Sequence, residues 1–181
     1  ARWRSRGIGK DAIMRINVSP VQLVTDGFVE TVASIIDEFG LDHGSVCLEI
    51  TESVVVDDIE ATRITLNGLK QAGVRIAIDD FGSGYSALWY LREFPVDEVK
   101  LDRFFVATVA GDPRAAAVVS AIIDLAHDLD ITVVAEGVEE AATAYWLRDK
   151  RCDVAQGYYF GRPVAGDAVP AVIASFRNAS H

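Results

Sequence analysis

Cysteine and histidine are scarce in this chain, which has two cysteines and three histidines among its 181 residues. Cys47 and Cys152 stand alone rather than in a pair with metal-ligand spacing, and both lie in apolar, strand-like stretches. They are therefore expected to be small buried side chains, which suits a reducing cytoplasm. The histidines, His43, His127 and His181, show no paired spacing either, so no zinc site is predicted.

Basic residues are outnumbered: 17 Lys and Arg stand against 27 Asp and Glu, which gives a formal net charge of -10. This balance argues against a nucleic-acid polymer or an anionic membrane as the main partner. A small phosphate ligand remains compatible with it if metal ions or a few local cations supply positive charge.

Long apolar runs and targeting signals are also absent from the sequence as given. Residues 1–7 are basic but no apolar segment follows them, and the longest apolar stretches, such as Ala115 to Ile123, are too short to span a bilayer. With 50% hydrophobic and 24% charged residues, the chain is expected to form one globular domain. We expect a cytoplasmic domain without membrane contact of its own, within a parent that another domain could tether to a membrane.

Strand-like and helix-like segments alternate along the chain. Apolar residues at three- and four-residue spacing, with capping residues and glycine stops, predict six helices. These are expected at residues 20–39, 59–72, 87–94, 115–129, 141–148 and 168–176. The strand before each helix is expected to end in a polar or charged side chain: Asn17, Glu49, Asp79 with Asp80, Lys100, Glu136 and Gln156. Six strand-helix units in a row predict an α/β fold with parallel strands and outer helices.

The adjacent carboxylates Asp79 and Asp80 mark the centre of the predicted site. An apolar, mostly β-branched strand at residues 74–78 ends at them, and Gly-Ser-Gly follows at 82–84. One interpretation is that one of the two carboxylates caps the next helix. The pair and the two glycines favour a functional turn instead, because alternating strand-helix barrels carry their chemistry at the carboxyl ends of the strands.

Carboxylates and an amide dominate these strand ends, and such oxygen ligands suit Mg²⁺ or Mn²⁺ rather than Zn²⁺. Packed carboxylates repel one another unless they are protonated or metallated, so the cluster predicts a site for two divalent cations that activate water against a phosphoryl group. Lys100 is expected to stay protonated among them and to hold the attacking water or a phosphoryl oxygen; the alternative is a structural salt bridge. Glu139 is expected to face the same site as Glu136, from the first turn of a helix.

Six segments, in this order, resemble the EAL-domain phosphodiesterases of bacterial cyclic di-GMP signalling. They are residues 17–23 (NVSPVQL), 48–53 (LEITES), 78–86 (IDDFGSGYS), 99–102 (VKLD), 134–139 (VAEGVE) and 156–163 (QGYYFGRP). The resemblance extends over essentially all 181 residues. It implies a modified TIM (β/α)8 barrel and a metal-dependent hydrolysis of cyclic di-GMP to the linear dinucleotide pGpG.

The resemblance also implies a metal-ligand set. Asn17, Glu49 and Asp79 would hold one Mg²⁺ or Mn²⁺ ion, with Asp79 bridging to a second ion on Asp80. Glu136 would lie in the same cluster, either as a ligand through water or as the base.

Further roles follow from the same resemblance. Lys100 would hold the nucleophilic water, while Glu139 and Gln156 would fix the surrounding hydrogen bonds. Glu52 would anchor the loop at 80–86, which couples metal binding to dimer contacts in this family. The helix at 115–129 is then a candidate for part of a homodimer surface, although its apolar face could equally pack on the barrel.

The Glu-Ala-Leu motif that names the family is absent, because the chain begins after the place where it should occur. A full barrel takes ~250 residues, so about 70 residues and two of eight strands are expected to be missing. Residues 1–181 are therefore interpreted as a single EAL domain without its N-terminal portion. Since the missing Glu is a metal ligand in the family, the chain alone is expected to be impaired. The parent could also carry a diguanylate cyclase or sensory domain.

Three functions stay open at this point. The first is a phosphodiesterase in the intact parent, and the second is a receptor or scaffold that binds cyclic di-GMP without hydrolysing it. The third is a magnesium-dependent barrel lyase or decarboxylase that uses Lys100 and Asp102 on a carboxylate substrate. The Asp79-Asp80 pair argues against the third, because that chemistry usually needs fewer adjacent acids.

Overall fold

The structure is a computed structural model that describes residues 12–51, 59–82 and 87–179. Glu52, whose predicted role is to anchor the loop after Asp80, lies outside the described residues, as does most of that loop.

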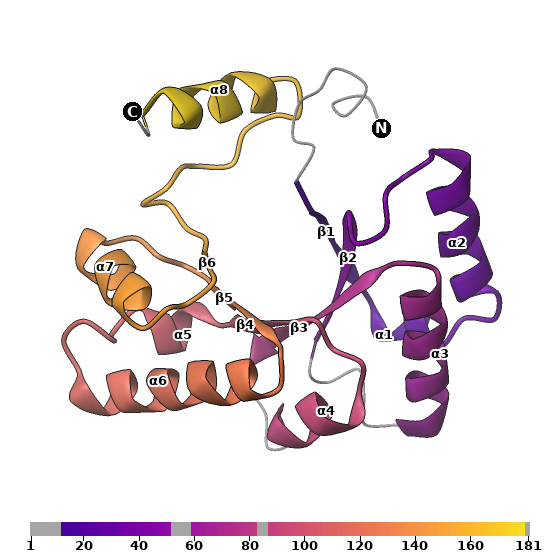
Figure 1. Cartoon of the computed structure of the whole chain (residues 1–181), viewed down its shortest axis with the longest axis horizontal. Coiled ribbons are helices and arrows are strands. Elements are labelled where there is room, and N and C mark those ends of the chain that lie inside the picture. The colour runs from indigo at the N-terminus through magenta and orange to yellow at the C-terminus, as the bar shows by residue number, and fades with distance from the viewer. Residues whose placement is uncertain (1–11, 52–58, 83–86, 180–181) are drawn as a thin grey trace.

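Six strands form one parallel sheet in the order β1-β2-β3-β4-β5-β6. The strands are β1 (Met14–Val18), β2 (Val46–Thr51), β3 (Arg75–Phe81), β4 (Glu98–Leu101), β5 (Thr132–Ala135) and β6 (Val154–Ala155). Helices alternate with the strands, and Figure 1 shows α2, α3, α4, α6 and α7 around the outside of the curved sheet. The predicted α/β fold with parallel strands is therefore confirmed.

Eight helices are present in the described residues, two more than the sequence pattern predicts. They are α1 (Pro20–Leu23), α2 (Phe28–Glu38), α3 (Ile59–Gln71), α4 (Ala87–Glu93), α5 (Arg103–Val106), α6 (Pro113–Asp128), α7 (Ala141–Asp149) and α8 (Val169–Ala179). The single helix predicted at 20–39 is wrong: Gly27, with φ 77°, takes the left-handed conformation and separates α1 from α2. The short helix α5 was not predicted, and Asp102 caps it by accepting a hydrogen bond from the Phe104 amide at 2.7 Å.

The two faces of the sheet differ in chemistry. Alternate residues of strands β2 to β5 point outward into a continuous apolar core beneath the helices. Among the most deeply buried are Ile50, Ile76, Ile78, Val99, Leu101 and Val133 from the sheet and Leu66, Leu69, Val119 and Ile123 from the helices. The residues between them point to the inside of the curve and include most of the charged side chains of the strands. The fold thus separates an apolar outer core from a polar interior.

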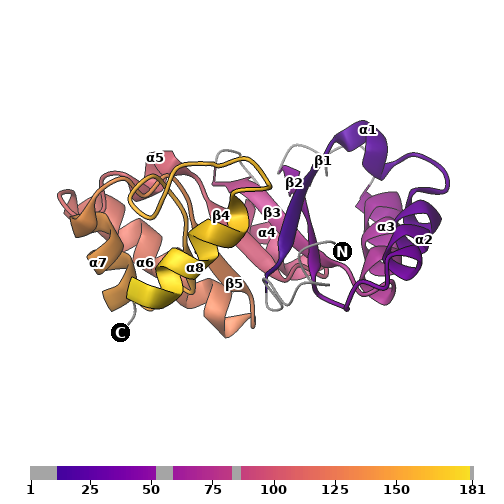
Figure 2. The ribbon, with the colours of Figure 1, turned by 90° about the horizontal axis from the view of Figure 1, so that it is seen from above.

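β1 and β6 form the two edges of the sheet within the described residues. Figures 1 and 2 show α8 on the far side of the ring from β3 and β4, across the interval between these edges. Met14 and Ile16 of β1 are about half exposed. None of the helices in the described part of the chain has both the length and the apolar character to cross a membrane.

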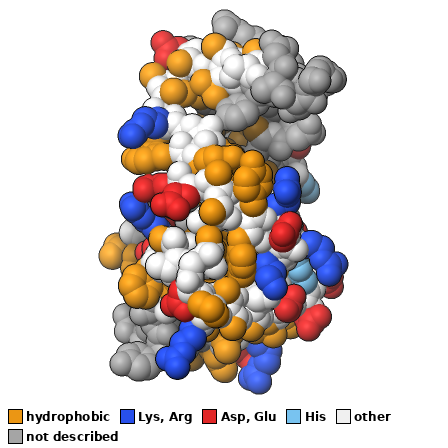
Figure 3. Space-filling model, turned by 90° about the vertical axis from the view of Figure 1, so that its left-hand side faces the viewer, with side chains coloured by type: hydrophobic (Ala, Val, Ile, Leu, Met, Phe, Trp, Pro, Cys, Tyr) orange, Lys and Arg blue, Asp and Glu red, His pale blue; other side chains and the backbone are white. Residues whose placement is uncertain are grey.

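Aromatic and charged side chains share the surface around α7. Tyr145, Tyr158 and Tyr159 are exposed, and the guanidinium of Arg162 lies 4.5 Å from the centre of the Tyr158 ring. Figure 3 views the molecule from this side and shows hydrophobic side chains interspersed with acidic and basic ones. This face therefore offers no broad basic surface for an anionic polymer.

Candidate functional site

The ammonium group of Lys100 lies at the centre of three carboxylates. Its Nζ is 2.9 Å from Glu49 Oε2, 2.9 Å from Asp79 Oδ1 and 2.9 Å from Glu136 Oε1. Lys100 and Glu49 are buried, whereas Asp79 and Glu136 are partly exposed. The predicted convergence of these four side chains is confirmed, and the cluster is open on the side of the two partly exposed carboxylates.

Parallel strands bring the cluster together, because their carboxyl ends meet at the same edge of the sheet. Glu49 lies near the end of β2, Asp79 near the end of β3, Lys100 near the end of β4 and Glu136 directly after β5. Residues separated by 87 positions in the sequence thus share one site.

A β-bulge in β3 sets the orientation of Asp79 and Asp80. Ile78 and Phe81 on β3 pair with Val99 and Leu101 on β4, so β3 contains one extra residue between these two register points. Asp80 has φ 54°, a conformation that Asp tolerates better than most residues, and its amide donates a hydrogen bond to Asp79 Oδ1 at 3.1 Å. The bulge lets Asp79 face Lys100 while Phe81 returns to the apolar core.

Electrostatics in the cluster keep Lys100 charged. Burial alone lowers the pKa of Lys100, but its hydrogen bonds to Glu49, Asp79 and Glu136 more than offset that effect and raise the pKa above its ordinary value. Burial raises the pKa of Glu136; Lys100 opposes this rise, and the neighbouring Asp79 and Glu49 add to it. The pKa of Asp80 is also raised, by burial and then by the charges of Asp79 and Asp102.

The donor set of the cluster fits a hard divalent cation. Three carboxylates around one ammonium leave an excess of negative charge, and every available donor atom is oxygen. Among the described residues, no group of three His, Cys, Asp or Glu side chains is already arranged to hold a metal ion. The carboxylates instead converge on the Lys100 ammonium.

Asn17 and Asp80 lie beside this cluster. Asn17 on β1 is the register partner of Glu49 on β2, so the two side chains share a face, and that of Asn17 is exposed. Asp80 is likewise exposed. Both side chains are accessible next to the Lys100 cluster, as a ligand role requires.

Glu139 follows β5 and Gln156 follows β6, on two segments that a backbone hydrogen bond joins. The prediction that Glu139 lies in the first turn of a helix is wrong. The Val138 amide donates to the Gln156 carbonyl at 3.0 Å, and α7 begins only at Ala141. The Glu139 carboxylate instead pairs with Arg103, with a shortest distance of 3.2 Å. The Gln156 side chain is exposed at the end of β6.

Two alternative interpretations of acidic residues can be compared with these contacts. The carboxylate of Asp79 contacts Lys100 rather than the start of a helix, so it does not serve as a helix cap in the described contacts. Asp102, the second residue of the proposed lyase pair, caps α5 instead. The lyase interpretation therefore loses one of its two residues.

A second charged cluster lies deeper inside the curve of the sheet, and the sequence patterns did not identify it. The fully buried Glu98 carboxylate accepts two hydrogen bonds from Arg15, at 2.7 and 3.2 Å, and its other oxygen is 3.1 Å from Arg75 Nη2. Cys47 lies beside this cluster, fully buried as predicted, and burial raises the pKa of its thiol to about 12. The sequence does contain one indication of this cluster. Arg15 and Glu98 each precede a predicted site residue by two positions, so each lies on the same face of its strand as that residue.

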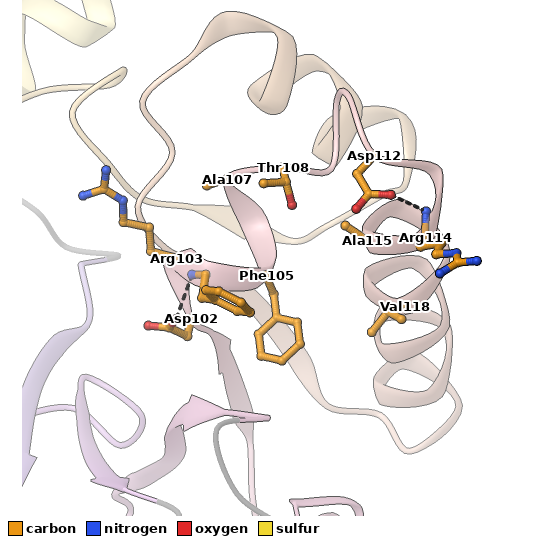
Figure 4. Close-up of a pocket in the computed structure, with 10 residues that line it drawn as sticks. Asp102, Arg103, Phe105, Ala107, Thr108, Asp112, Arg114, Ala115 and Val118 are labelled. Atoms are coloured by element: carbon orange, nitrogen blue, oxygen red, sulfur yellow. Dashed lines mark hydrogen bonds between the residues drawn. The ribbon is translucent and has the colours of Figure 1, made fainter.

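A hollow of about 790 Å³ lies between α5 and α6, beside the strand ends. Figure 4 shows Phe105 and Val118 at this hollow, with Asp112 accepting a hydrogen bond from the Arg114 amide at its rim. Phe104, which also lines it, is 82% exposed. Exposed aromatic surface of this kind is a feature of interaction sites.

The comparison with protein families and curated proteins gives a consistent result. The EAL domain family matches residues 1–163. The protein Rv1354c of Mycobacterium tuberculosis is 50% identical over 177 residues, which make up 98% of this chain and 28% of that protein. The bifunctional diguanylate cyclase/cyclic di-GMP phosphodiesterase MucR of Pseudomonas aeruginosa is 39% identical over 159 residues, 88% of this chain and 23% of MucR. The chain thus spans about a quarter of the length of these relatives.

Solved structures share the fold. The EAL domain of Mycobacterium smegmatis DcpA matches with a TM-score of 0.92 and 53% identity, over 96% of this chain and 78% of that one. The complex of the MucR phosphodiesterase with c-di-GMP matches with a TM-score of 0.84 and 38% identity, over 93% of this chain and 68% of that one. A complex of Klebsiella pneumoniae BlrP1 with manganese and cyclic di-GMP matches with a TM-score of 0.81 and 34% identity, over 89% of this chain and 41% of that one. In sequence and in fold, the chain belongs to the EAL domain family.

Proposed function

We propose that this chain provides the catalytic face of a metal-dependent phosphodiesterase that hydrolyses cyclic di-GMP to pGpG. The observation that carries the proposal is the cluster of Glu49, Asp79 and Glu136 around the buried ammonium of Lys100. The cyclic di-GMP complex of the MucR phosphodiesterase and the manganese complex of BlrP1 support the substrate class and the need for a cation.

Asn17, Glu49, Asp79 and Asp80 would hold two divalent cations. When bound, such cations stabilise negative charge on a phosphoryl oxygen and lower the pKa of a coordinated water. The carboxylates of this chain would position them, and the excess negative charge of the cluster favours their binding.

Lys100 would stabilise negative charge during the reaction, and Glu136 would accept the proton of the attacking water. The raised pKa of Lys100 keeps Nζ protonated, so it donates hydrogen bonds to the attacking water or to a non-bridging phosphoryl oxygen. The raised pKa of Glu136 makes its carboxylate a stronger proton acceptor than an ordinary one, as a general base requires. Water would add to phosphorus as Glu136 takes its proton, the bond from phosphorus to the 3′-oxygen would break, and that proton would return to the 3′-oxygen, so that the product keeps a 5′-phosphate and a 3′-hydroxyl. Glu139 and Gln156 would hold the surrounding hydrogen bonds.

The test is turnover of cyclic di-GMP with Mg²⁺, with Mn²⁺ and with a chelator, following pGpG by chromatography. It is made on the 181-residue chain and on any longer polypeptide in which this sequence occurs. Asp79→Asn and Lys100→Met should each lower turnover on the order of 100-fold or more, because each removes charge from the reacting centre.

Lys70→Met is the control, because Lys70 is also a lysine in an ion pair, although a more exposed one, and it contacts Asp97, away from the cluster. Its turnover should equal that of the wild type. Binding of cyclic di-GMP by both polypeptides without pGpG formation would overturn the catalytic roles of Lys100 and Glu136 and favour a receptor.

We also propose that the hollow between α5 and α6 is part of a homodimer surface. The exposed ring of Phe104 and the half-exposed Val118 at this hollow support an apolar contact with a second copy. α6 covers nearly the whole of the predicted dimer helix at 115–129.

Phe104→Ser should weaken self-association roughly tenfold or more, because exposed aromatic anchors often dominate an interface. Sedimentation equilibrium measures the dissociation constant. Ile64→Ser on α3 removes another exposed apolar side chain, 62% accessible, and should not change it. Equal dissociation constants for both variants and the wild type would place the interface elsewhere.

A further inference from the structure

The buried charge cluster of Arg15, Arg75 and Glu98 touches the Lys100 cluster at one point. Arg15 Nε is 3.9 Å from Glu49 Oε1, while Glu49 Oε2 is 2.9 Å from Lys100 Nζ. Glu49 therefore lies between two cations, one on each carboxylate oxygen. Arg75 approaches only Glu98 among the ion pairs of the described residues.

Arg15 is itself held rigidly. Its Nε and Nη2 both donate to Glu98 Oε2, at 3.2 and 2.7 Å, and the Glu98 side chain is completely buried. A guanidinium fixed through two of its nitrogens keeps its plane and its position, which a single contact would not ensure. Glu98 on β4 thus fixes the guanidinium of Arg15 on β1, which lies within ion-pair distance of Glu49 on β2, at 3.9 Å.

We propose that Arg15, anchored by Glu98, is a positioning residue that holds the Glu49 carboxylate ready for a divalent cation. This inference rests on the proposed function, because it takes Glu49 as a metal ligand. With a divalent cation held by Glu49, Asp79 and Asp80, the guanidinium of Arg15, 3.9 Å from Glu49 Oε1, would restrict the orientations of the Glu49 carboxylate. Residues that orient a metal ligand from behind have large effects on affinity without touching the metal.

A different outcome is expected if Arg15 acts only through its charge. A guanidinium near the site would repel a divalent cation, so its removal would then strengthen binding. If Arg15 instead positions Glu49, its removal weakens the binding of the divalent cation.

The experiment measures Mn²⁺ affinity from the electron paramagnetic resonance signal of free Mn²⁺, with no substrate present. Arg15→Met should weaken Mn²⁺ binding on the order of 10-fold or more, and Glu98→Gln, which loosens the anchor, should weaken it in the same direction. Arg75→Met is the matched control: it removes the other arginine from Glu98 and should leave the affinity within about twofold of the wild type. Arg15→Lys keeps a cation at the same position and should restore part of the loss.

Urea unfolding of each variant separates this effect from general destabilisation, because Arg15→Met and Arg75→Met both disturb the same buried carboxylate. Equal Mn²⁺ affinities for these two variants, or tighter binding by Arg15→Met, would overturn the inference. If Arg15→Met does not fold, the comparison of Glu98→Gln and Arg15→Lys with Arg75→Met decides in the same way. Asp79→Asn tests the proposed function separately: wild-type Mn²⁺ binding that this change leaves intact would contradict the metal site itself.

Discussion

At the scale of single residues, the candidate site depends on groups whose ionisation is shifted by their neighbours. Lys100 keeps its proton although it is buried, because three carboxylates accept hydrogen bonds from it. Glu136 and Asp80 lie in the same electrostatic setting and hold protons more tightly than ordinary carboxylates do. The charge of the site therefore changes with pH at higher values than the charge of ordinary carboxylates does.

Mn²⁺ affinity should fall as the pH is lowered, beginning above the pH at which ordinary carboxylates take up protons. A cation binds the deprotonated carboxylates, and the pKa values of Glu136 and Asp80 are raised, so protons compete with it earlier. Titrations between about pH 8 and about pH 5 measure this dependence. Glu136→Gln should show a weaker dependence, and a wild-type affinity that stays constant over this range would contradict the assignment.

At the scale of elements, the short strand β6 is extended by contacts that no local pattern reveals. The Val138 amide donates to the Gln156 carbonyl at 3.0 Å, and the Tyr159 amide donates to the Val138 carbonyl at 3.0 Å. Gly157 lies between these bonds, and a Cβ added there would meet the carbonyl oxygen of Val138 at 2.1 Å. Only glycine permits this close backbone approach, which holds Gln156 at the edge of the site.

Gly157→Ala should lower the free energy of unfolding by about 3 kcal/mol or more, because the clash is with backbone atoms that cannot rotate away. Urea denaturation measures the change. Gly161→Ala is the control, since an added Cβ there has no atom within 4 Å. If the two variants lose the same stability, the close approach at Gly157 does not matter.

Secondary-structure elements with several turns or strand repeats could be predicted from the sequence. Elements whose conformation depends on a contact with a distant part of the chain could not. The six strands followed from the alternation of strand and helix patterns, with strand ends within two residues of the predicted polar positions, and the cluster around Lys100 followed from parallel topology. The four-residue helix α5 is too short for a helical period, and the break at Gly27 depends on one backbone angle. The extended course before Glu139 depends on pairing with residues near 156, and the contact of Arg15 with Glu98 spans 83 positions.

At the scale of the whole molecule, the curved sheet keeps two kinds of chemistry apart. The outer face packs against helices through apolar side chains, and the inner face carries the deep Arg15, Arg75 and Glu98 cluster below the Lys100 cluster. Stability thus comes mainly from the outer face, while the inner face is free to hold charge that would be costly in an apolar core. This division explains how one small chain can concentrate carboxylates without losing its fold.

The central claim is that this site adds water to a phosphodiester of cyclic di-GMP. The most direct measurement is turnover in ¹⁸O-labelled water, with mass spectrometry of the product formed by the chain and by a longer polypeptide that contains it. We expect release of pGpG that depends on a divalent cation and carries one labelled oxygen in its 5′-phosphate. Asp79→Asn should give no such product. Cyclic di-GMP that is bound but recovered intact and unlabelled from both polypeptides, with Mg²⁺ and with Mn²⁺, would contradict the claim.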